Sequence, residues 1–191
     1  IRQRIIYTSD TNLDVPAYLL IPKNVEGKLP AVVAVHGHGY GSRDTVGLNS
    51  DGTEKNGEAG YQKNFALELV KRGFLVIAPE LLGFGDRTMQ ADADKIHTNG
   101  NSCYYISTYL LMMGKTMAGA RIYDVLRAID YLVSRDDVDT GRIGCMGISG
   151  GGLVCAFASA VDERIRAAVV SGYTNTFKDS IMSMYHCIDN Y

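Results

Sequence analysis

The chain has 191 residues, of which 46% are hydrophobic and 21% are charged, and its formal net charge at pH 7 is −2. This composition is typical of one ordinary globular domain, and it argues against a basic nucleic-acid footprint and against a membrane-surface patch. No apolar run approaches the roughly 20 residues that a membrane-spanning helix needs, and no signal-peptide pattern opens the sequence. Because residue 1 is Ile rather than Met, we expect the natural N-terminus to be missing.

The first part of the chain predicts the beginning of a β-sheet. Apolar runs at 4–7 and 15–22 flank a polar turn, which favours two antiparallel strands at a sheet edge. Residues 30–35 are continuously apolar, as in a strand buried on both faces of a parallel sheet. The glycine-rich run H-G-H-G-Y-G at 36–41 follows this strand directly, where open α/β sheets place their ligand sites.

The middle of the chain predicts one more strand and several helices. Residues 41–60 are expected to form a long polar loop, either over the site or merely on the surface. A helix is predicted at 61–72, with Phe65, Leu69 and Val70 on one face. The remaining predicted elements are a strand at 74–78, a polar irregular segment at 89–100, a helix at 103–113 carrying three tyrosines, and an amphipathic helix at 118–134.

Two features of these middle segments carry specific expectations. The loop 80–87 reads E-L-L-G-F-G-D-R. Glu80 and Asp86 either structure this loop by pairing with Arg87 or act directly in catalysis, and the pairing is the preferred alternative. The tyrosine-bearing helix at 103–113 either covers a pocket or packs on the sheet, and packing on the sheet is the preferred alternative.

The sequence R-I-G-C-M-G-I-S-G-G-G at 142–152 is the stretch around which the chain is organised. An apolar run leads into the G-x-S-x-G motif around Ser149, and a helix-compatible segment follows. A sharp strand-to-helix turn with glycines two positions before and after the serine lifts the hydroxyl out of the sheet. It also aims the N–H of Gly150 at the same space, at a helix start where positive charge collects. The motif therefore predicts a nucleophile and an oxyanion donor from adjacent residues.

Other chemistry-bearing residues are weaker candidates. His36 and His38 lack a nearby carboxylate at ligand spacing, so we expect no metal there and no cofactor elsewhere. The four cysteines match no metal pattern and are expected to be reduced thiols, consistent with a cytoplasmic location. Cys145 and Cys155 are expected to be buried. A final strand is predicted at 167–172, followed by a loop without a clear element at 173–191.

The order of these motifs resembles the serine α/β-hydrolase superfamily, and most closely its dienelactone-hydrolase-like and acetyl-xylan-esterase-like branch. The resemblance implies a mostly parallel, doubly wound α/β sheet with helices on both faces, read here as one domain over 1–191. It also implies that the N–H groups of His38 and Gly150 hold the oxyanion. Dienelactone hydrolases proper use a cysteine nucleophile, so Ser149 favours the esterase side of the group.

The catalytic acid and base of this family follow the serine on later strands. Only 42 residues follow Ser149, which is too few for two further strand-helix units, so we expect the fold to be truncated and both groups to lie beyond Tyr191. His186 is the only later histidine and the only candidate base within the chain. Packing near the pocket mouth or exposure to solvent is the preferred reading of this residue.

Three functions follow from these features. The first is hydrolysis of small acyl esters, with a small-molecule substrate and Ser149 as nucleophile. The second is a prolyl-peptidase-like serine peptidase, which shares the same elbow. The third is a non-catalytic α/β module that uses the pocket or an exposed sheet edge for binding, and the absent acid and base provide its motivation. An exposed edge would also allow the fragment to self-associate.

Overall fold

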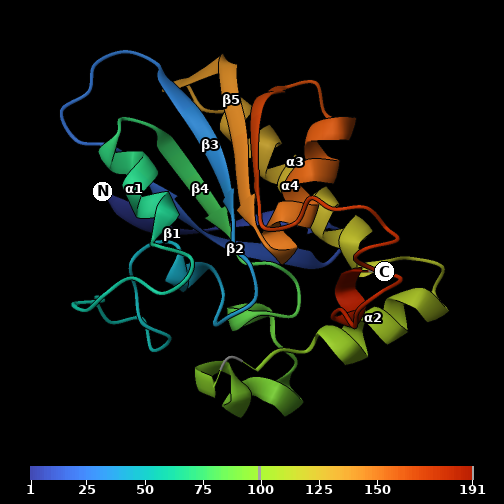
Figure 1. The fold of residues 1–191 in the computed structure, drawn as a ribbon. Coiled ribbons are helices and arrows are strands. Elements are labelled where there is room, and N and C mark those ends of the chain that lie inside the picture. The colour runs from blue at the N-terminus through green and yellow to red at the C-terminus, as the bar shows by residue number, and fades with distance from the viewer. Residues whose placement is uncertain (99, 191) are drawn as a thin grey trace.

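The computed structural model describes residues 1–98 and 100–190, and its main feature is one six-stranded sheet in the order β1-β2-β4-β3-β5-β6 (Figure 1). The N-terminal strands pair antiparallel with each other, and β2 pairs antiparallel with β4. The other pairs are parallel, which confirms the predicted edge hairpin and the parallel core. The strands are β1 (Arg2–Asp10), β2 (Leu13–Leu20), β3 (Leu29–Val35), β4 (Leu75–Pro79), β5 (Val138–Ile148) and β6 (Ile165–Ser171).

Helices cover both faces of this sheet, as the doubly wound prediction requires (Figure 1). On one face α3 (Met117–Val133) and α4 (Gly150–Val161) build the larger apolar core with β3 and β5. On the other face α1 (Phe65–Lys71) packs on β3 and β4 in a smaller core. No helix among the described residues is long and apolar enough to cross a membrane.

The helix predicted at 61–72 begins later than expected. Lys63 and Asn64 have φ values of 50° and 48°, in the left-handed region, so α1 starts only at Phe65. Tyr61 and Gln62 form a turn before it, and both side chains reach the loop that follows β3. Hydrogen bonds between these two side chains and the loop after β3 are present where the sequence predicts the first turn of the helix.

The predicted pairing of Glu80 and Asp86 with Arg87 is wrong. Arg87 instead forms a buried ion pair with Asp124 of α3, at 2.5 Å. Its only link to Glu80 is a hydrogen bond to the backbone carbonyl, at 3.1 Å. Asp86 pairs with Arg4 and Arg43 from distant segments. The segment is therefore fixed by tertiary contacts, which its local sequence did not reveal.

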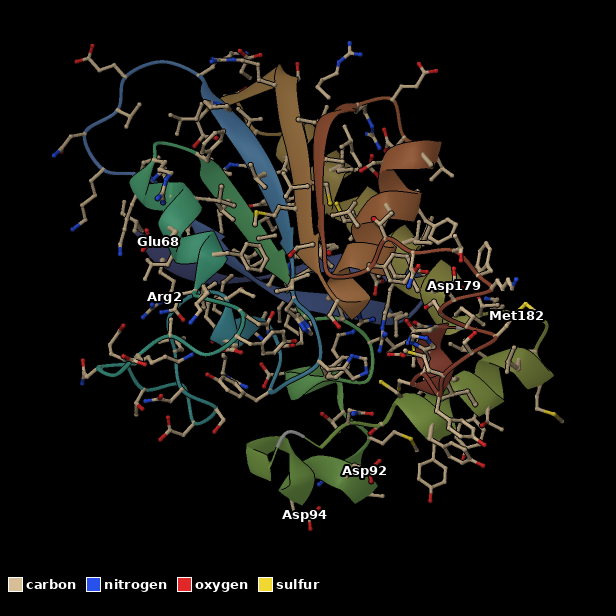
Figure 2. The ribbon with its side chains drawn as sticks, viewed as in Figure 1. Arg2, Glu68, Asp92, Asp94, Asp179 and Met182 are labelled. Atoms are coloured by element: carbon tan, nitrogen blue, oxygen red, sulfur yellow. The ribbon has the colours of Figure 1, made fainter. Side chains whose placement is uncertain are left out.

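The segment after this loop contains two helical elements, and the first of them, which carries Asp92 and Asp94, lies apart from Asp179 and Met182 of the C-terminal segment (Figure 2). The stretch expected to be irregular forms the 3₁₀ helix η3 (Gln90–Thr98), and Asn99 lies outside the described residues. Helix α2 (Cys103–Met112) confirms the predicted helix, but it packs against α3 and η4 (Ile188–Asn190), and its three tyrosines are exposed. It buries Cys103 and Ser107, and the preferred sheet-packing role does not describe it.

The predicted final strand is present as β6, which lies at the other edge of the sheet from β1. Its middle residues are exposed, including Val169 at 52%. An edge strand with exposed backbone groups is a template for pairing. Self-association through this edge stays a prediction, as does the single-domain reading.

Helix α3 offers a direct test of the core. Leu132 is fully buried, whereas its neighbour Val133 is 39% exposed. Leu132→Ala is expected to lower the free energy of unfolding by about 2–5 kcal/mol, because it leaves a cavity between α3 and the sheet. Val133→Ala should cost no more than about 0.5 kcal/mol. Urea titrations followed by circular dichroism would measure both, and equal costs would contradict the described packing.

Candidate active site

Ser149 lies at the sharp turn between β5 and α4, as the G-x-S-x-G motif predicts. Its backbone has φ 54° and ψ −122°, a conformation that costs a non-glycine residue on the order of 1–3 kcal/mol. The turn is held from both sides. The Ser149 N–H donates to the Ser171 carbonyl at 2.8 Å, and the Leu153 N–H donates to the Ser149 carbonyl at 3.1 Å.

The glycines around Ser149 are required by close backbone packing. A Cβ on Gly147 would overlap the Gly151 carbonyl, and a Cβ on Gly151 would overlap the carbonyl oxygen of Val35 at the end of β3. Helix α4 can therefore start against the ends of β3 and β5 only with these small residues. Gly150 is the first residue of the helix, so its N–H has no acceptor within α4.

The loop after β3 is fixed by residues that the sequence did not single out. The Gly37 N–H donates to Gln62 Oε1 at 2.9 Å, and Gln62 Nε2 donates to Asp44 at 3.1 Å. The Tyr61 hydroxyl donates to the carbonyl oxygen of His38. Gln62 is 1% exposed, so its two bonds lie in the interior, whereas Tyr61 is 51% exposed and holds His38 from the surface. They hold the backbone of His38 beside the start of α4.

Glu80 supports the same loop from β4 and carries a buried charge. Its carboxylate accepts hydrogen bonds from the Ser42 N–H and hydroxyl, both at 2.9 Å, and lies 3.1 Å from Nε2 of the buried His36. Burial alone would raise the pKa of Glu80, but the contacts with His36 and Ser42 outweigh it and hold the pKa below its usual value. His36 is therefore a packed supporting residue.

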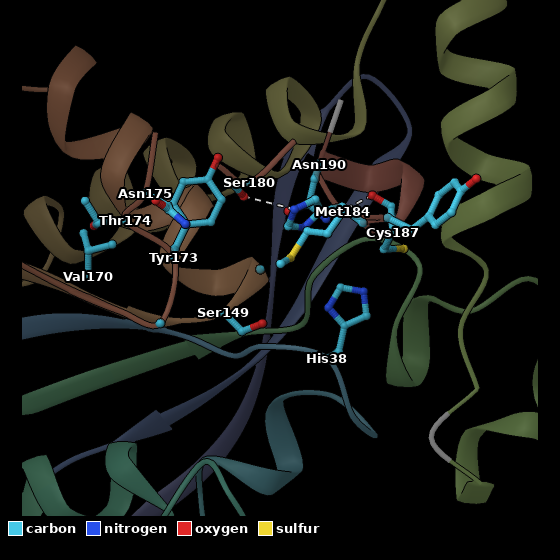
Figure 3. A pocket seen from close by; sticks show the side chains of 14 residues that line it. His38, Ser149, Val170, Tyr173, Thr174, Asn175, Ser180, Met184, Cys187 and Asn190 are labelled. Carbon is cyan, nitrogen blue, oxygen red and sulfur yellow. Dashed lines mark hydrogen bonds between the residues drawn. The ribbon is translucent and has the colours of Figure 1, made fainter. Parts of the chain in front are cut away.

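Ser149 and His38 line a pocket of about 590 Å³ together with the C-terminal segment (Figure 3). The side chain of Ser149 points toward His38 (Figure 3). Gly150 also lines the pocket, and a Cβ on it would approach His38 Nδ1 to 3.3 Å. The structure thus brings together the three predicted site residues. Polar side chains of Asn175, Ser180 and other C-terminal residues form the opposite wall.

His186, the candidate base from the sequence, also lines this pocket. Its Nε2 atom is hydrogen-bonded to Ser180 Oγ at 3.0 Å (Figure 3). Among the described residues no hydrogen bond joins His186 to Ser149 or to a carboxylate. This arrangement agrees with the preferred reading of His186 as a residue near the pocket mouth.

Four side chains that are distant in sequence meet at one side of the pocket. They are His38, Cys103, Cys187 and Asp189, and their potential ligand atoms all lie within 4.8 Å of one another. A hydrogen bond from Cys103 Sγ reaches Asp189 Oδ2 at 3.2 Å, and His38 Nε2 lies 3.5 Å from the same oxygen. The sequence argument against a metal considered only neighbours in the chain, and 86 residues separate Cys103 from Asp189.

The ionisable groups in this cluster shift one another's pKa values. The Cys103 thiol and His38 lower the pKa of Cys187 to about 5, against the opposing effect of burial. The pKa of Cys103 is raised, first by its contact with Cys187 and then by burial. The neighbouring Cys187 raises the pKa of His38, and burial opposes this. Burial would raise the pKa of Asp189, but Arg121 outweighs it and lowers the pKa.

The cysteines agree with two expectations from the sequence, free thiols and the burial of Cys145 and Cys155. All four are free, and Cys145 and Cys155 are buried as expected. The sequence contained no signal that would join Cys103 to Cys187, because their proximity depends on how η4 docks on α2. The polar residues Gln62 and Asp44 were missed for the same reason.

Comparison with known proteins shows which family the chain belongs to. Residues 3–184 match the family model described as acetyl xylan esterase (AXE1). The chain belongs to this family. It is also 39% identical over 157 residues to a Bacillus subtilis (strain 168) protein described as "Putative hydrolase YtaP", a match that covers 81% of this chain and 46% of the relative. The family is one of hydrolases and esterases of the α/β-hydrolase superfamily.

Solved structures show the same fold. An acetyl xylan esterase from Paenibacillus sp. R4 matches 97% of this AXE1-family chain and 53% of its own, with a TM-score of 0.63 and 20% identity. A Bacteroides fragilis structure described as a "putative acetyl xylan esterase" matches with a TM-score of 0.73 and 19% identity, over 85% of this chain and 42% of its own. The chain therefore spans about half the length of the relatives it matches.

The elbow geometry can be tested through its glycines. Gly151→Ala places a methyl group against the Val35 and His36 carbonyls and is expected to destabilise the fold by about 1–3 kcal/mol. Each kcal/mol corresponds to ~2–4 °C in Tm for a chain of this size. The matched control is Gly57→Ala, whose added Cβ has no atom within 4 Å. Scanning calorimetry that gave the same Tm for both variants would contradict the close packing of α4.

Glu80 predicts a pH-dependent stability. Because its pKa is lower in the folded state than its ordinary value of 4.5, its ionised form stabilises the fold fully above that value. This contribution is lost as the pH falls through the lowered pKa. Glu80→Gln is expected to cost about 1–3 kcal/mol near neutral pH, and the difference from the original protein should shrink in acid.

Urea unfolding at a series of pH values would measure this difference. Glu26→Gln removes the same charge from an exposed loop and serves as the control, with stability close to the original at every pH. A cost of Glu80→Gln that stayed constant between neutral and acid pH would show that the buried charge is not its source.

Proposed function

We propose that the protein hydrolyses carboxylic esters with a small acyl group of the acetyl type, with Ser149 as the nucleophile. The observation that carries this proposal is the left-handed backbone of Ser149 at the strand-to-helix turn, which presents its side chain to the pocket. Membership of the acetyl xylan esterase family supports the ester class and the acetyl group.

In the proposed reaction the Ser149 hydroxyl oxygen attacks the ester carbonyl. The N–H of Gly150, at the N-terminus of α4, and the N–H of His38 stabilise the oxyanion that forms, because fixed donors need no reorganisation as the charge develops. The alcohol then leaves, and water releases the acyl group from Ser149. The bonds from Tyr61 and Gln62 support this role, since they fix the loop that carries His38.

The attack on the carbonyl needs a base that removes the hydroxyl proton. His186 is held by Ser180, so it does not serve this role in the described arrangement. The base that takes this proton then returns it to the leaving alcohol. A pocket of about 590 Å³ lined by polar side chains suits a small polar ester better than a long acyl chain.

Covalent labelling tests the proposed nucleophile. A fluorophosphonate is expected to add once per protein molecule, at Ser149, in the purified protein, and hydrolysis of p-nitrophenyl acetate should fall by at least about 10³-fold in Ser149→Ala. Ser134→Ala, an exposed substitution at the end of α3, serves as the control and should retain both labelling and turnover.

Intact mass and peptide mapping would locate the adduct. Turnover that persisted in Ser149→Ala would refute the mechanism. Cleavage of peptide anilides in preference to the acetate ester would instead favour the peptidase.

A further inference from the structure

The cluster of His38, Cys103, Cys187 and Asp189 has the composition of a metal site. It joins three parts of the chain: the loop after β3, the first residue of α2, and the C-terminal turn η4. Cys103 and Asp189 are at most 2% exposed, so the site is largely shielded from water. Thiolate sulfur, imidazole nitrogen and carboxylate oxygen are the ligands that Zn²⁺ takes in proteins.

The distances fit a four-coordinate ion. Ligand atoms placed about 2.0–2.3 Å from a tetrahedral zinc lie about 3.3–3.8 Å from one another. The Cys103 sulfur is 3.2 Å from Asp189 Oδ2, and His38 Nε2 is 3.5 Å from the same oxygen. All four potential ligand atoms lie within 4.8 Å of one another, and small side-chain rotations can bring them to the tetrahedral spacing.

His38 supplies an independent observation. Its Nε2 atom is buried and has no hydrogen bond of ordinary geometry among the described residues. Buried polar atoms are nearly always paired, so an unpaired one calls for an explanation. This nitrogen faces Asp189 and Cys187, and a metal ion bound between them would satisfy it.

Arg121 is the cation already present beside the cluster, and its charge is compatible with a metal. It donates to Asp189 Oδ2 at 2.5 Å and to Cys103 Sγ at 3.2 Å. Two thiolates and one carboxylate around a divalent ion leave one net negative charge, which the guanidinium neutralises. Groups that hydrogen-bond to metal ligands orient them and tune the site in this way. Arg121 is further held by the Leu82 carbonyl, so its position is fixed.

We propose that His38, Cys103, Cys187 and Asp189 bind one zinc ion that clamps the C-terminal turn to α2 and to the loop after β3. Four protein ligands leave no open coordination position, so the ion is structural. The thiols bind as thiolates and release their protons to solvent. By fixing His38 and Cys187, the clamp shapes one wall of the pocket that contains Ser149. Metal binding requires none of the proposed ester chemistry.

Cobalt is a spectroscopic substitute for zinc in such a site. The purified protein, treated with a chelator and kept reduced by a phosphine, is titrated with Co²⁺. The expected result is one ion per chain, with thiolate-to-cobalt charge-transfer absorption from two sulfurs and visible bands of a four-coordinate ion, all removed by one equivalent of Zn²⁺. Absence of stoichiometric uptake, or uptake without sulfur bands, overturns the proposal.

Variants assign the ligands. Cys187→Ser should halve the charge-transfer absorption and weaken zinc binding by more than the roughly 10–100-fold that loss of an outer-shell partner costs. Cys155→Ser is the matched control, because Cys155 is buried on α4 against the Val169 carbonyl and outside the cluster. It should bind cobalt as the original protein does. Circular dichroism would confirm that both variants fold.

A stability measurement completes the test. Because an ion that binds only the folded state stabilises it, zinc should raise the Tm of the original protein and of Cys155→Ser. The rise should be absent in Cys187→Ser. An equal rise in all three proteins would place the ion elsewhere and overturn the assignment. None of these measurements depends on ester turnover, so a failure of the metal site and a failure of the proposed function are distinguishable.

Discussion

The close approach of α4 to the ends of β3 and β5 is the constraint on which the rest of the site depends. Neighbouring backbone atoms fill the space that a side chain on Gly147 or Gly151 would need. Because these two residues have no side chain, the start of the helix can lie directly against the sheet. The chain can make that turn only by placing Ser149 in the left-handed region. The cost is offset by burial along α4, where Leu153, Val154 and neighbouring residues join the main core. The apolar packing of α4, away from the site, thus compensates for the backbone strain at Ser149.

Buried polar groups hold the loop after β3 in place through their hydrogen bonds. Glu80, Gln62 and their partners have few alternatives, because an unpaired polar group in the interior costs more than the bond itself returns. The carboxylate of Glu80 is also enclosed by backbone, since a Cβ on Gly41 or Gly85 would overlap it. The two loops at the carboxyl ends of β3 and β5 are therefore positioned by separate networks that meet at the pocket.

The sequence predicted those parts of the molecule that depend on local pattern. The apolar runs of β3 and β4, the periodicity of α3 and the glycine spacing at Ser149 each contain their own evidence, and the structure confirms these elements. Predictions failed where distant partners decide the outcome. Arg87 pairs with Asp124 rather than with Glu80 or Asp86, and the turn before α1 follows hydrogen bonds to the loop after β3. The cluster around Cys187 is the extreme case, because no short-range pattern relates its members.

His38 contributes both to the pocket that contains Ser149 and to the cluster that contains Cys187. Its backbone belongs to the loop after β3. Its imidazole lies between the elbow, where a Cβ on Gly150 would be 3.3 Å from Nδ1, and Asp189, which is 3.5 Å from Nε2. The backbone of the same residue is held separately, because its carbonyl accepts a hydrogen bond from the Tyr61 hydroxyl. The proposed role of the His38 N–H as an oxyanion donor requires a group that is held in place before the reaction, and the contacts of the carbonyl and of the ring both meet this requirement. The C-terminal turn, which supplies Asp189, therefore reaches the elbow through the ring of His38.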